Sequence, residues 1–108
     1  QVDATLCLSK IPLLNGFTEV VASGIESTLA PANREVESRM KWDPPGERSQ
    51  LPEASSLFDP QTSGGLLIAT RPENSTRLLD ALANADIGAG IIGSVGPKSD
   101  RPTLTISK

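Results

Sequence analysis

At residues 59–69 the chain reads DPQTSGGLLIA, a turn-forming segment that runs directly into four apolar residues. A continuous apolar run bounded by turn formers is typical of a strand that is buried on both faces of a sheet. We therefore predict a strand over residues 66–69. Because this would be the most buried strand of the chain, the other elements are expected to pack around it.

The polar half of this stretch carries ligand-binding chemistry. It offers one carboxylate, one amide, two hydroxyls and two glycines, the latter allowing close backbone approach or positive φ. These groups belong to Asp59, Gln61, Thr62, Ser63, Gly64 and Gly65. Such a loop can bind an anion through its amides or a hydrated cation through its carboxylate. It is not a Walker phosphate loop, because lysine is absent and a strand follows. On the residues alone, a tight turn at the start of a strand is favoured over a ligand site.

Two elements are predicted near the amino terminus. Apolar and polar residues alternate over 2–8, the pattern of a strand with one buried face. Pro12 suits a first helical turn, and apolar residues at three- and four-residue spacing predict a helix over 12–23 that stops at Gly24. Gly16 would then lie inside the helix, at a cost of about 1 kcal/mol relative to alanine.

The carboxy-terminal part predicts a helix followed by two strands. Pro72 and Glu73 open a helix with an apolar stripe that should face the core. The stripe consists of Leu78, Leu79, Leu82 and Ala85. Residues 91–95 read as a strand, 96–100 as a turn and 103–106 as a closing strand, so the last two strands are predicted to form an antiparallel hairpin.

Residues 26–57 show no periodicity and contain four prolines, so a long loop is predicted. A loop of this length in a compact domain is usually a functional flap or partly disordered. Trp42 is expected to pin it by burying its ring. Asn33 is a candidate phosphate contact, although a local cap is favoured. The mixed charges between Arg34 and Lys41 are most simply a solvated surface.

Together these elements predict an α+β fold: one domain over residues 1–108, with a mixed β-sheet and helices packed on one face in two layers. A chain of 108 residues is long enough to bury its own core.

Composition narrows the classes of function. The net charge of −3 gives no basic excess for nucleic acid. There is no histidine and Cys7 is the single cysteine, which excludes an intrachain disulfide, the usual zinc sites and an imidazole-dependent triad. These features favour a reducing, cytoplasmic location. No stretch approaches the ~20 apolar residues of a membrane span. Because the sequence starts without Met, we expect it to be either an expressed segment or a fragment.

The motif over residues 59–69 resembles one found near the end of selenophosphate synthetases (selenide, water dikinases), members of the aminoimidazole ribonucleotide synthetase superfamily. The similarity extends to IPLLNGFTEVVASGI at 11–25, PENSTRLLDAL at 72–82 and IIGSV at 91–95. With these anchors the resemblance covers nearly the whole chain.

The resemblance implies a carboxy-terminal domain that forms one wall of the nucleotide cleft. The parent would use ATP and magnesium, act as a homodimer and pair this domain with an amino-terminal ATP-binding domain. The catalytic cysteine or selenocysteine and the metal-binding aspartates lie in that amino-terminal half, so this chain is expected to be inactive alone, with no catalytic residue, no metal ligand and no bound cofactor. Cys7 is then a small structural residue. The implied cleft-lining residues are Asp59, Gln61, Thr62, Ser63, Gly64, Gly65 and Asn33.

Two positions depart from the family pattern. A glycine-rich run usual in relatives is replaced at residues 26–32, although Asn33 matches. Asp86 stands where a glycine is usual, so the end of the second helix must place an aspartate in a left-handed or otherwise unusual conformation. The alternative hypothesis is a stand-alone module of the same fold that binds a small ligand or a protein.

Overall fold

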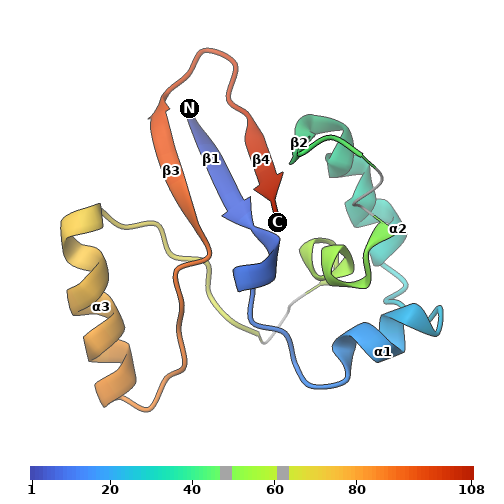
Figure 1. The fold of residues 1–108 in the computed structure, drawn as a ribbon, viewed down its shortest axis with the longest axis horizontal. Helices are drawn as coiled ribbons and strands as arrows, with labels where there is room; N and C mark the ends of the chain where they lie inside the picture. Colours follow the sequence, from blue (N-terminus) through green and yellow to red (C-terminus); the bar gives the residue numbers. More distant parts are fainter. Residues whose placement is uncertain (47–49, 61–63) are drawn as a thin grey trace.

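The computed structural model describes residues 1–46, 50–60 and 64–108. Four strands form one mixed sheet in the order β2-β4-β1-β3 (Figure 1). The strands are β1 (Val2–Cys7), β2 (Met40–Asp43), β3 (Gly93–Lys98) and β4 (Leu104–Ser107). β1 is parallel to β4 and antiparallel to β3, and β2 is parallel to β4. The predicted α+β class with a mixed sheet is confirmed.

The predicted hairpin of the last two strands is wrong, because β1 lies between them. Both ends of the connection from β3 to β4 bond to the start of the chain. Ser99 donates to the carbonyl of Gln1 (3.1 Å), and the Thr103 amide donates to Oδ1 of Asp3 (2.8 Å). β1 pairs with both β3 and β4, and so occupies the position between them that a hairpin would not leave open.

The helices flank the sheet: α3 lies on one side of it, and α1 and α2 lie on the other (Figure 1). The α-helices are α1 (Phe17–Ala22), α2 (Ala30–Asn33) and α3 (Pro72–Asn84), and the 3-10 helices are η1 (Leu8–Lys10), η2 (Arg34–Arg39) and η4 (Pro52–Leu57). The helix predicted over 12–23 starts late. Gly16 has φ 85°, a left-handed value that glycine adopts readily, so it marks the helix start and not its interior. Gly24 (φ 84°) follows the helix end as predicted.

The long loop predicted over 26–57 is instead structured, with α2, η2, β2 and η4 inside it. β2 exists because it pairs with β4, a partner more than sixty residues away that no local pattern reveals. Trp42 packs against the core, as expected, and its buried indole Nε1 has no hydrogen-bond partner among the described residues.

The buried strand predicted over 66–69 is also wrong. Leu66 and Leu67 are 87% and 75% exposed, and the segment belongs to no strand. β4 and β1 are the central strands, β2 and β3 are the edge strands, and the apolar run pairs with none of these four.

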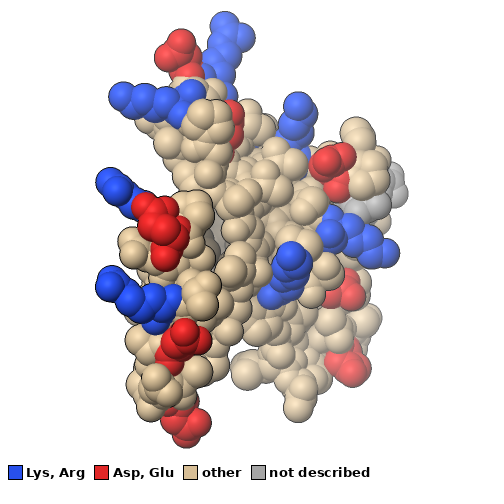
Figure 2. Space-filling model, turned by 60° about the vertical axis from the view of Figure 1, so that its left-hand side comes forward, with Lys and Arg blue, Asp and Glu red and all other residues tan. Residues whose placement is uncertain are grey.

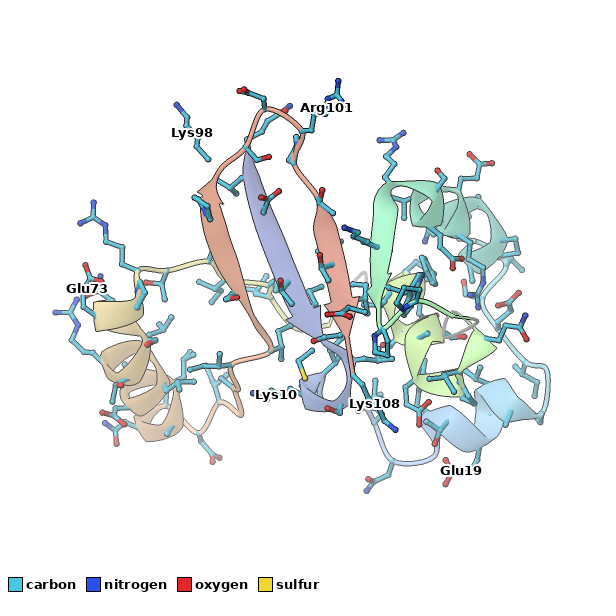
Figure 3. All side chains as sticks on the ribbon, turned by 45° about the horizontal axis from the view of Figure 1, so that its top comes forward. Lys10, Glu19, Glu73, Lys98, Arg101 and Lys108 are labelled. Atoms are coloured by element: carbon cyan, nitrogen blue, oxygen red, sulfur yellow. The ribbon has the colours of Figure 1, made fainter. Side chains whose placement is uncertain are left out.

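α3 begins at Pro72 as predicted, and Asp86 after it has φ 59°, the left-handed conformation expected there. The stripe, however, does not enter the core: Leu78, Leu79 and Leu82 are half-buried and Ala85 is exposed. α3 stands beside the sheet without extensive contact to another described element, and Glu73 lies on its outer side (Figures 1 and 3).

The core lies between the sheet and η4. Leu8, Ala54 and Ile106 are at most 6% exposed, and η1, η4 and β4 supply them. Six half-buried residues pack around them: Leu6, Ile11, Met40, Trp42, Leu57 and Leu104. This packing fixes η4, and with it the residues that lead into the 59–69 motif.

Candidate functional site

The candidate site is built around Asp59, two residues beyond the end of η4. Phe58 before it is 1% exposed and anchors the chain. The amides of Phe58 and Asp59 both donate to the Ser55 carbonyl, at 3.1 and 3.0 Å. The helix end therefore holds the backbone of Asp59, while its side chain is half-buried.

Asn33, at the end of α2, contacts this backbone directly. Its Nδ2 donates to the carbonyl of Phe58 at 2.8 Å, in a partly buried bond. The local cap favoured from sequence is wrong, because the Asn33 side chain makes no capping bond to η2. Asn33 instead links two segments 25 residues apart in sequence, which a local pattern could not reveal.

Arg34 adds a second link, which sequence reasoning missed. Its Nη2 donates to Oγ of Ser55 (2.9 Å) and to Oε2 of Glu26 (3.3 Å). Its guanidinium also lies 4.9 Å from the centre of the Phe58 ring, a cation–π distance. The solvated-surface interpretation is therefore wrong for Arg34, whose side chain is 29% exposed.

A pocket of about 310 Å³ lies between α1 and the end of η4. Its apolar wall includes Phe17, Val20 and Ile25, and its polar lining includes Glu26, Ser55 and Asp59. Small-ligand sites commonly combine a largely apolar wall with a few polar groups, and this volume is at the lower end of their range.

Asn33 does not line that pocket. It borders a second, more open hollow of about 430 Å³ together with Glu35, Val36, Arg39 and Leu57. The structure therefore brings Asn33 and Asp59 together through Phe58, yet they line different hollows.

The other predicted site residues contribute less. Gly64 and Gly65 are exposed, and a Cβ placed on Gly65 would meet no atom within 4 Å. Close backbone packing thus does not require glycine at position 65. The predictions for Gln61, Thr62 and Ser63 concern residues outside the described ranges.

Cys7 lies apart from this site, on β1. Its Sγ donates to the carbonyl of Lys108 (3.2 Å) and lies 3.4 Å from Oγ of Ser9. The Ser9 hydroxyl is the main cause of a lowered pKa for the Cys7 thiol. Figure 3 shows Lys10 and Lys108 at the same end of the sheet.

Within the described ranges, no three His, Cys, Asp or Glu side chains gather as they would around a metal ion. In the same ranges, no helix is both long enough and apolar enough to span a membrane.

The fold and the pocket define an α+β domain with a candidate small-ligand site at the end of η4. No family model matches the chain. Curated relatives do: the selenide, water dikinase of Trichlorobacter lovleyi is 35% identical over 106 residues, covering 97% of this chain and 30% of that relative. The selenide, water dikinase of Enterobacter sp. (strain 638) is 33% identical over 106 residues, covering 97% and 29%. That of Clostridioides difficile is 52% identical over 46 residues, covering 42% and 13%.

The chain is thus homologous to selenide, water dikinases over nearly its whole length, and the resemblance seen in the sequence is confirmed. It spans about 30% of the length of these relatives, as one domain of such a protein would.

Proposed function

We propose that this chain is the carboxy-terminal, cleft-wall domain of an ATP-dependent selenophosphate synthetase. The parent would convert selenide, ATP and water to selenophosphate, AMP and phosphate. The observation that carries the proposal is the 35% identity over 97% of the chain to an enzyme more than three times as long.

In this proposal Asp59 lines the nucleotide side of the domain, and Asn33 holds the backbone just before it. Three features support that role. Asp59 lines a pocket of suitable size for part of a ligand, its backbone is fixed by Ser55, and Asn33 holds the preceding carbonyl. A rigid backbone positions polar groups better than a free loop, because less order must be created on binding.

The described residues do not form a complete site for ATP and magnesium. Phosphoryl transfer needs cationic groups and metal ions to neutralise charge on the phosphates. Arg34 is a cation beside the pocket, because it bonds Glu26 and Ser55, which line it, and these two bonds already hold its guanidinium. The described ranges also lack a gathering of metal ligands. We propose that an amino-terminal ATP-binding domain of a homodimeric, cytoplasmic parent supplies both groups, as the resemblance to selenophosphate synthetases implies.

A chimera tests the proposal. This chain would replace the matched 106 residues of the Trichlorobacter lovleyi enzyme, and AMP formation that depends on selenide and magnesium would be measured. The chimera should be active, whereas the 108-residue chain and the relative lacking its matched residues should stay at background.

Two results would contradict the proposal. One is metal-dependent AMP production by the 108-residue chain itself. The other is a folded chimera without activity, while the unaltered relative is active under the same conditions. The pocket beside Asp59 would then favour the second candidate, a stand-alone binding module of the same fold.

A further inference from the structure

A second surface, away from the Asp59 pocket, is apolar and uncovered. It is formed by the segments that lead to and from α3 and by the edge strand β3. We call it the apolar surface, and it consists of Leu66, Leu67, Ile68, Ile87, Ile91 and Val95. Each of these side chains is more than half exposed. Figures 1 and 3 show both segments between α3 and the sheet.

The sheet is open on the same side. β3 is the outermost strand, it pairs with β1 on one side, and all six of its residues are exposed. Edge strands with free backbone groups attract further strands unless proline or charge blocks them. Pro97 and Lys98 protect the end of β3, but the stretch from Gly93 to Gly96 has neither device.

Between the charged side chains, this side of the molecule carries stretches without Lys, Arg, Asp or Glu. Figure 2, turned to bring the α3 side forward, shows mixed charges at the top and along one side of this face, Lys or Arg side chains also near its middle, and residues other than Lys, Arg, Asp and Glu between them. A contiguous exposed apolar area with a polar rim marks a site of protein contact more often than a free surface.

We infer that the apolar surface and the open edge of β3 are the contact face for the part of the parent protein that lies outside these 108 residues. The inference rests on the proposed function. The matched residues make up 30% of the Trichlorobacter lovleyi relative, so most of such a protein is available as the occupant. A face of the same molecule is always present at high effective concentration, which suits a surface that is costly to leave in water.

Thiol labelling in the chimera described above tests this. Leu67→Cys and Val95→Cys place a thiol on the apolar surface, and Leu29→Cys is the matched control, since Leu29 and Val95 are both 56% exposed. Maleimide labelling would be followed peptide by peptide, so that Cys7 is resolved separately. In the 108-residue chain all three introduced thiols should react rapidly. In the chimera, labelling at 67 and 95 should slow by about tenfold or more, as expected for sites that react only after local opening, while labelling at 29 stays unchanged.

Three results would overturn the inference. The first is a folded chimera in which positions 67 and 95 label as fast as in the 108-residue chain. The second is protection of these positions in the 108-residue chain as its concentration rises, because the occupant would then be a second copy. The third is a chimera that fails to fold although the unaltered relative folds under the same conditions. The inference requires this chain to present a face that the rest of the relative can bind. Protection in a chimera without activity would support this inference while the proposed function fails.

Discussion

The side-chain amide of Asn33 donates a hydrogen bond to the backbone carbonyl of Phe58, 2.8 Å away, and so ties the end of α2 to the residue before Asp59. Phe58 is itself 1% exposed. The bond therefore fixes the entry to the 59–69 motif from outside the motif.

Asn33→Ala should lower the free energy of unfolding by about 1–2 kcal/mol, because it leaves a partly buried carbonyl without its donor. Asn33→Asp should cost a similar amount, since a carboxylate cannot donate. Urea denaturation followed by Trp42 fluorescence measures both. Asn15→Ala, at an exposed position, is the control and should change stability by less than ~0.5 kcal/mol. Equal losses at positions 15 and 33 would mean that the bond contributes nothing specific.

Arg34→Ala should cost about 2 kcal/mol, because one guanidinium bonds Ser55 and Glu26 and lies over the Phe58 ring. Arg34→Lys should recover only part of this, as an ammonium lacks the planar fork. Arg71→Ala is the matched control. Arg71 is paired with Glu73 at 4.0 Å, but both side chains are largely exposed, so less than ~0.5 kcal/mol is expected. A silent Arg34→Ala would restore the solvated-surface interpretation.

Two glycines of β3 give a contrast within one strand. A Cβ at Gly93 would collide with the backbone carbonyl of Thr5, whereas one at Gly96 would meet Asp3 at 3.4 Å, an ordinary contact. Gly93→Ala should therefore destabilise by ~1–3 kcal/mol and Gly96→Ala by clearly less, since backbone atoms of β1 cannot move aside cheaply. Thermal unfolding of both variants measures the difference. Equal midpoints would show that β1 and β3 are not as close as described.

The sequence predicted what local chemistry controls. The alternation over residues 2–8 located β1, Pro72 located the start of α3, and the position of Asp86 indicated its left-handed conformation. It failed where distant partners decide. β2 depends on its pairing with β4, the place of β1 on its pairing with β3 and β4, and the contact of Asn33 on Phe58. The apolar runs at 66–69 and on α3 were predicted to lie in the core. That prediction fails because an apolar pattern does not show whether another element covers the apolar side chains.

The difference in stability between a core position and a half-buried position on α3 can be measured on two side chains. Ile106 is 1% exposed in the core, so Ile106→Ala should cost ~2–5 kcal/mol. Leu82, predicted from sequence to be core, is half-buried on α3, and Leu82→Ala should cost only about 1 kcal/mol in the 108-residue chain. Denaturation curves that show equal losses would place the α3 stripe in the core after all.

Asp59 provides the test of the cleft itself, in the active chimera. Asp59 lines the pocket and is half-buried, and its backbone amide donates to the carbonyl of Ser55. Asp59→Asn keeps the shape and removes the charge. Turnover should fall by about tenfold or more while the thermal midpoint stays nearly unchanged, because a lost transition-state interaction lowers kcat without loosening the fold.

Asp80→Asn, on the exposed face of α3, is the control and should leave both quantities unchanged. If residues 59–65 are only a turn that leads into a strand, the opposite result is expected. Loss of a structural carboxylate would lower the thermal midpoint and the activity together. If Asp59→Asn loses stability and turnover in parallel, or keeps full turnover, the carboxylate does not act at the nucleotide cleft. A lower turnover with an unchanged midpoint, combined with a silent Asp80→Asn, leaves direct action on the bound substrate as the physical explanation.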